Sequence, residues 1–179
     1  MGRDYVPAGR GLYLVFWGQI VGLFAGFPLL GGIAYLASLA LTVYGLYLAA
    51  NSDEGYQTAM YLAMAGIVLG VLGLFWNHGA LGSLVGIAQD IVGLMQVYFI
   101  CGTTSQMLHE IGEHSEADRG TLVWRINLIC YLAAIGMSAL VFLMAPLAWV
   151  LAICTVIALL VAGILFLIFL WNSQKAFQR

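Results

Sequence analysis

The sequence has very few charged residues. Only 8% of its 179 residues are Asp, Glu, Lys or Arg, whereas 63% are hydrophobic and the mean hydropathy is +1.00. A soluble domain carries about a quarter charged residues. This composition cannot cover a water-facing surface, so it excludes a soluble protein. The net charge is −2 and no basic run occurs, so we expect no nucleic-acid partner.

Cysteine and the signatures of enzymes are also scarce. Cys101, Cys130 and Cys154 each lie within an apolar stretch and form no C-x-x-C pair, which argues against a disulfide framework. We interpret them as packing residues. The sequence has no P-loop, no Gly-x-Ser-x-Gly and no H-E-x-x-H motif. We therefore expect no catalytic residue, no metal and no cofactor. Whether the protein is an enzyme stays open: a role without catalysis is favoured, and an intramembrane enzyme that uses the segment from His109 to His114 is the least favoured interpretation.

Long apolar stretches dominate what remains. A membrane-spanning helix needs about 20 apolar residues. Residues 11–50 make two spans, which Gly26-Phe27-Pro28 separates, and residues 121–171 make two more, divided at Met144-Ala145-Pro146. The sequence predicts an all-α polytopic membrane protein in which residues 1–179 form one bundle of six transmembrane helices. We expect these helices at about 11–27, 29–50, 56–76, 81–108, 121–145 and 147–171.

The charged residues indicate the orientation of this bundle. With six spans, both termini and the connections after the second and fourth spans share one side of the membrane. All six basic residues fall on that side: Arg3, Arg10, Arg119, Arg125, Lys175 and Arg179. Because cytoplasmic loops hold an excess of Lys and Arg, we expect both termini in the cytoplasm. We predict that the protein lies in the plasma membrane, which in a bacterium is the inner membrane, with the lipid bilayer as its first partner.

One acidic residue lies inside an apolar stretch. Asp90 is in the middle of the predicted fourth helix, and all other charged residues fall on the predicted cytoplasmic side. An intramembrane carboxylate is costly unless it is paired or hydrated, so we expect Asp90 to face the bundle interior or a hydrated cavity. The other candidate binding residues are Ser83, Gln89 and Gln96 on the same predicted helix, Gln19 on the first, and His78 near the end of the third.

Glycines recur at intervals of three or four residues in several predicted helices. Such stripes let helix backbones approach closely in lipid. The candidate packing residues are Gly18, Gly22 and Gly26 on the first helix and Gly66 and Gly70 on the third. Two interpretations stay open. The stripes pack helices within the monomer, or the stripe on the first helix binds a second copy or a partner membrane subunit.

The most hydrophilic loop is expected to run from His109 to Gly120. Its histidines and acids could in principle bind a metal. However, His109-Glu110-Ile111-Gly112-Glu113-His114 matches neither of the zinc-protease motifs H-E-x-x-H and H-x-x-E-H. Gly112 would also weaken a helix here. We interpret this segment as a solvated acidic loop.

Two functions remain open. The first is a small transporter or substrate-binding membrane subunit, with a small molecule or an ion bound at a central polar site on the fourth helix. The alternative is a non-catalytic scaffold, assembly or regulatory protein that binds partner helices through glycine-rich faces. In size and helix number the chain resembles the substrate-binding membrane subunits of energy-coupling-factor vitamin transporters. That resemblance is architectural and implies no site residue here.

Overall fold

A computed structural model describes residues 5–24, 31–75, 80–141 and 148–178. The side chains at 74, 80, 81, 83, 134–141 and 148–152 lie outside this description. The described residues form six α-helices and contain no strand. Their bounds are α1 Val6–Leu23, α2 Gly31–Ala50, α3 Glu54–Phe75, α4 Ala80–Glu110, α5 His114–Val141 and α6 Ala148–Phe177.

Two short turns on one side of the bundle have clear local causes. Asp53 immediately precedes α3. Its carboxylate accepts a hydrogen bond of 2.7 Å from the Gly55 backbone N–H, as the side chain of an N-cap residue does. Gly112 follows α4 with φ +84°. Its N–H donates to the His109 carbonyl and the Glu113 N–H donates to the Leu108 carbonyl, which is the Schellman pattern. The α4–α5 connection is therefore only three residues long.

This turn corrects the predicted hydrophilic loop from His109 to Gly120. Residues 114–120 are the first two turns of α5, which begins seven residues before the predicted start at 121. The prediction was wrong because it treated polar composition as a loop. A helix can extend beyond the apolar region into water, and Glu116 in its first turn suits the positive end of the helix dipole.

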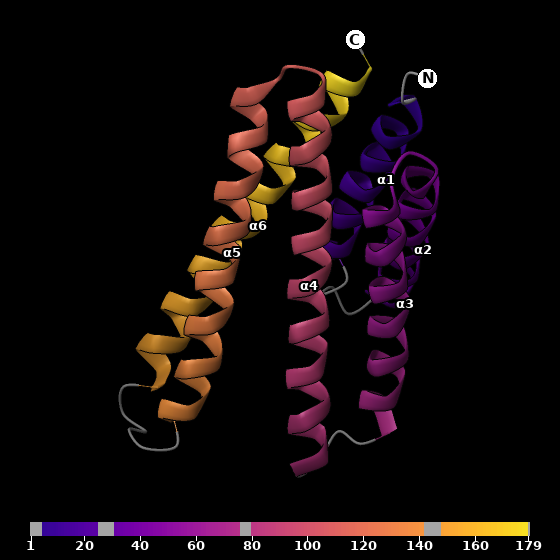
Figure 1. Cartoon of the computed structure of the whole chain (residues 1–179). Coiled ribbons are helices and arrows are strands. Elements are labelled where there is room, and N and C mark those ends of the chain that lie inside the picture. Colours follow the sequence, from indigo (N-terminus) through magenta and orange to yellow (C-terminus); the bar gives the residue numbers. More distant parts are fainter. Residues whose placement is uncertain (1–4, 25–30, 76–79, 142–147, 179) are drawn as a thin grey trace.

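The six helices form a closed ring. Each helix packs against its neighbours in the chain, and α6 closes the ring against α1. Both termini lie at one end together with the α4–α5 turn, and we call this the termini end (Figure 1). Towards the opposite end, the α5–α6 pair diverges from α4 (Figure 1).

Four of the described helices are long and apolar enough to cross a membrane. These candidate spans are Gly31–Ala50, Glu54–Gly73, Leu84–Glu110 and Ile153–Phe177. They agree with the predicted helical membrane protein.

Among the described side chains, the buried apolar core lies at the termini end of the ring. Its residues come from the start of α1, α3 and α5 and from the end of α2, α4 and α6, and Tyr56, Met107 and Phe169 are among the largest. The hydroxyls of Tyr56 and Thr104 share a buried hydrogen bond of 2.7 Å between α3 and α4. The Ser105 hydroxyl donates to the Ala117 carbonyl at 2.9 Å between α4 and α5. Close packing therefore seals this end.

Glycines bring α1 and α2 together at the same end. A Cβ added at Gly45 would lie 2.6 Å from the Gly11 carbonyl oxygen and 2.9 Å from the Val15 nitrogen. Both neighbours are backbone atoms, so they cannot move aside without moving the helix. This contact is among the closest helix approaches in the described part of the bundle.

Candidate functional site: a central polar chamber

A chamber lies inside the ring, next to the core. Its first lobe has a volume of about 300 Å³ between α1, α4, α5 and α6, and its second has about 230 Å³ between α1, α2, α3 and α4. Gln19, Gly93 and Gln96 line both lobes, so the lobes meet at these residues. Ile100 and Phe166 belong both to the core and to the wall of the first lobe. The chamber therefore ends directly on the packed termini end.

Most of the chamber wall is apolar, but several polar residues converge on it, and none of its described residues is charged. Its polar residues are Gln19, Tyr35, Ser38, Thr42, Gln89, Gln96, Asn127 and Tyr131. Asn127 is buried, and its Nδ2 donates a hydrogen bond of 2.9 Å to the Val123 carbonyl. Amides and hydroxyls both donate and accept hydrogen bonds. Such a wall suits a ligand with uncharged polar groups.

Three carboxamides of this wall have no hydrogen-bond partner within the described ranges. They belong to Gln19 on α1 and to Gln89 and Gln96 on α4, and none of them is fully buried. A polar group in the membrane that lacks both water and a protein partner costs several kcal/mol by the order of magnitude of transfer data. Gln19 and Gln96 are half-buried and Gln89 is exposed, so within a membrane water or a ligand would have to reach these carboxamides.

The glycine stripes of α1 and α3 lie against polar side chains of neighbouring helices. A Cβ added at Gly18 would lie 2.7 Å from the Thr42 hydroxyl oxygen, and one added at Gly22 would lie 2.9 Å from that of Ser38. At Gly70 a Cβ would lie 3.3 Å from the Tyr35 hydroxyl oxygen. These glycines provide room for polar side chains of α2 beside the chamber.

A wider space extends from the second lobe toward the opposite end of the ring. This vestibule has a volume of about 780 Å³ between α2, α3 and α4. Tyr35, Leu39, Ile67 and Gln89 line both the vestibule and the chamber. Its wall continues to Gly73 near the end of α3. The vestibule and the chamber therefore form a path that ends on the buried core.

Asp90 departs from the position expected for it. Its side chain is exposed, and it is not one of the residues that line the chamber or the vestibule. Helix geometry explains why Asp90 and Gln96 do not line the same space: their separation by six positions leaves the two side chains about 120° apart around the helix axis. Asp90 instead lies within electrostatic range of the phenol of Tyr131, whose ring does line the first lobe.

The other predicted site residues are placed as follows. Gln19, Gln89 and Gln96 come together at the chamber. Gly66 lies against α4, where an added Cβ would be 3.7 Å from a methyl carbon of Val92. Three predicted residues lie outside the described part: Gly26, His78 and the side chain of Ser83.

Sequence reasoning missed most of the chamber residues on α2 and α5. Ser38, Thr42 and Tyr131 are single polar residues in apolar stretches, and nothing in their spacing distinguishes them from ordinary helix residues. Thr42 is four residues after Ser38, which places both on one face of α2. Two polar residues on one face of α2, opposite the glycine stripe of α1, are the pattern from which these residues could have been predicted.

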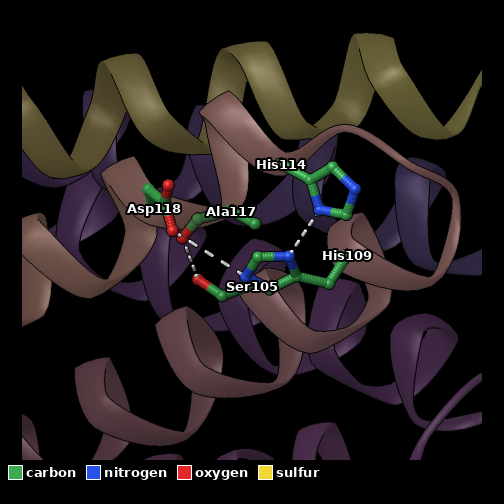
Figure 2. Close-up of polar contacts among 5 residues, drawn as sticks. All are labelled: Ser105, His109, His114, Ala117 and Asp118. Atoms are coloured by element: carbon green, nitrogen blue, oxygen red, sulfur yellow. Dashed lines mark hydrogen bonds and ion pairs between the residues drawn. The ribbon is translucent and has the colours of Figure 1, made fainter.

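The histidine-rich segment forms a small polar cluster at the termini end. The two Nδ1 atoms of His109 and His114 are 2.9 Å apart, and the other ring nitrogen of His109 is 3.9 Å from an Asp118 carboxylate oxygen (Figure 2). His109 therefore directs its two nitrogens to different partners. No group of three metal-ligating residues converges among the residues that the structure describes. The cluster joins the end of α4 to the start of α5.

Comparisons with protein-family models, curated proteins and solved structures found no match for this chain.

Proposed function

We propose that all six helices cross the membrane and that the termini end faces the cytoplasm. The bilayer would be the plasma membrane, which in a bacterium is the inner membrane. Support comes from the six Lys and Arg residues, all of which belong to the termini side of a six-span chain. In this orientation the packed core would lie on the cytoplasmic side and the vestibule would open outward.

We propose further that the protein is a small transporter or substrate-binding membrane subunit whose substrate occupies the chamber. The observation that carries this proposal is the convergence of unpartnered carboxamides from α1 and α4 on one internal space. That space lies at the end of a path from the opposite end of the ring. Ligand sites commonly have this form, a concave and largely apolar pocket with a few converging polar groups.

The packed core implies how such a subunit would work. Ile100 and Phe166, which belong to the packed core, form the wall of the chamber toward the termini end. A substrate bound from outside could reach the cytoplasm only after the helices move. A partner membrane subunit or a conformational change of the ring would supply that movement.

The alternative, a scaffold that binds partner helices through glycine-rich faces, has less support. Gly18 and Gly22 on α1 face hydroxyls of α2 in the same chain. Gly70 on α3 faces Tyr35 and Gln89. The stripes named for partner binding are therefore already in contact with neighbouring helices of the monomer.

A ligand-retention experiment tests the transport proposal. Purified protein in nanodiscs is incubated with a defined mixture of uncharged metabolites and inorganic ions, and mass spectrometry measures what is retained. Wild type should retain at least one compound. Gln96→Leu should retain it about 10- to 100-fold less, because losing one partner of a buried hydrogen bond costs roughly 1–3 kcal/mol.

Asp90→Asn is the matched control on the same helix, because Asp90 does not line the chamber. It should keep retention close to the wild-type level. Equal retention by wild type and Gln96→Leu, or no retained compound in either, would contradict the proposal.

A further inference from the structure

An apolar groove runs along the outside of the ring between α1 and α6. Its volume is about 480 Å³, and Leu23, Leu160, Ile164 and Leu167 form much of its wall. Leu23, Leu160 and Ile164 are more than half exposed. In a six-span bundle these side chains would face the hydrocarbon of the bilayer. The groove is thus a surface for apolar chains rather than for water.

The groove and the chamber share part of their walls. Gln19, Leu159, Gly163 and Phe166 line both the groove and the first lobe of the chamber. Gly163 is exposed, and a Cβ added there would meet no atom within 4 Å. The boundary between the two spaces is therefore formed by Leu159, Phe166, Gly163 and the carboxamide of Gln19. Gly163 adds no side chain to it, so a passage between the spaces would lie beside this residue.

The two spaces differ sharply in chemistry. Among the described residues of the groove wall only Gln19 is polar, whereas the first lobe is also lined by Gln96, Asn127 and Tyr131. Neither wall has a charged residue among the described side chains. A charged group placed there would lose its hydration with no counter-ion in the wall, which is strongly unfavourable.

We propose that the ligand is an uncharged amphiphile drawn from the bilayer. Its hydroxyl- or amide-bearing head occupies the first lobe beside Gln96 and Asn127, and its single hydrocarbon chain passes Gly163 and lies in the groove between α1 and α6. This inference rests on the proposed role of the chamber as a ligand site. Each space has the size of an ordinary ligand pocket, a few hundred Å³.

A photo-crosslinking experiment tests this occupant. The probe is a monoacylglycerol with a diazirine in mid-chain and a terminal alkyne, presented to the protein in phosphatidylcholine nanodiscs. Crosslinks should concentrate on the groove residues of α1 and α6. Unlabelled monooleoylglycerol should compete for them, whereas glycerol and the charged lysophosphatidylglycerol should not.

Gly163→Phe should fill the passage and reduce the saturable crosslinking roughly tenfold or more, the effect of an overpacking penalty of about 1–3 kcal/mol. Gly102→Phe is the matched control, because an added Cβ at Gly102 also meets nothing within 4 Å and Gly102 lines neither space. It should crosslink as wild type does.

Several results would overturn the proposal. They are crosslinks spread without competition over other exposed faces such as Val68, crosslinks to a second copy of the chain, equal competition by lysophosphatidylglycerol, and undiminished crosslinking of Gly163→Phe. Alkylation of Gln96→Cys by a water-soluble thiol reagent then tests the chamber separately from the amphiphile proposed to occupy it. If that thiol reacts, the chamber stands and only the amphiphile fails. If it does not react, the chamber proposal fails too.

Discussion

Gly45→Val is expected to destabilise the bundle strongly. The first carbon of the new side chain would lie 2.6 Å from the Gly11 carbonyl oxygen and 2.9 Å from the Val15 nitrogen. Overpacking usually costs about 1–3 kcal/mol, and the cost should reach or exceed the upper limit here because the obstacles are backbone atoms. Thermal unfolding of the detergent-purified protein, followed by size-exclusion chromatography, measures the loss.

The matched control is Gly102→Val on α4. Gly102 is exposed, and an added Cβ there meets no atom within 4 Å. The free energy of unfolding of this variant should differ from that of wild type by no more than about 0.5 kcal/mol, as is usual for surface substitutions. If both variants unfold at the wild-type temperature, the close approach of α1 and α2 is not a feature of the folded protein.

Gly93→Leu is expected to abolish ligand retention without unfolding the protein. Gly93 lines both lobes of the chamber, and an added Cβ would meet only the Tyr131 hydroxyl oxygen, at 3.9 Å. The leucine therefore has room to enter the chamber and would occupy the space where the lobes meet. Leucine also favours the helix over glycine by close to 1 kcal/mol. Retention of the compound bound by wild type should fall on the order of 100-fold or more.

The control for this variant is Gly102→Leu, which makes the same change on an exposed part of α4. Both variants should elute as folded protein, and only Gly93→Leu should lose the ligand. Normal retention by Gly93→Leu would mean that the compound binds somewhere other than the chamber. Loss in both variants would mean that α4 does not tolerate leucine, and the loss at Gly93 would then say nothing about the chamber.

The helical membrane character was predictable because it depends on composition and on the length of apolar runs. The position of the α4–α5 turn was not predictable in the same way. It is set by Gly112, one residue with a left-handed backbone conformation inside a polar segment. Polarity alone marked residues 109–120 as a loop, whereas helix α5 begins at His114. Membrane helices can extend beyond the apolar stretches that reveal them.

The candidate site was only partly predictable, and the reason is geometric. Gln19, Gln89 and Gln96 were found because polar residues are rare in apolar stretches. Asp90 was chosen by the same argument, yet its angle around α4 directs it away from the chamber. Asn127 and Tyr131 could not be assigned, because the side of α5 that faces the ring depends on how α5 packs against α4 and α6. Tertiary contacts carry that information.

The central claim is that a water-accessible polar chamber opens toward the side opposite the termini. Its most direct test is the reactivity of Gln96→Cys in intact cells, in a background where Cys101, Cys130 and Cys154 are alanine. The reagent is an uncharged methanethiosulfonate that carries a sugar, which makes it too polar to cross the membrane. The control is Val68→Cys. Val68 is exposed on α3 and lines neither the vestibule nor the chamber. Gln96→Cys should react from outside, and Val68→Cys should not. A Gln96→Cys thiol that resists the external reagent, or reacts only in opened cells, would contradict the claim.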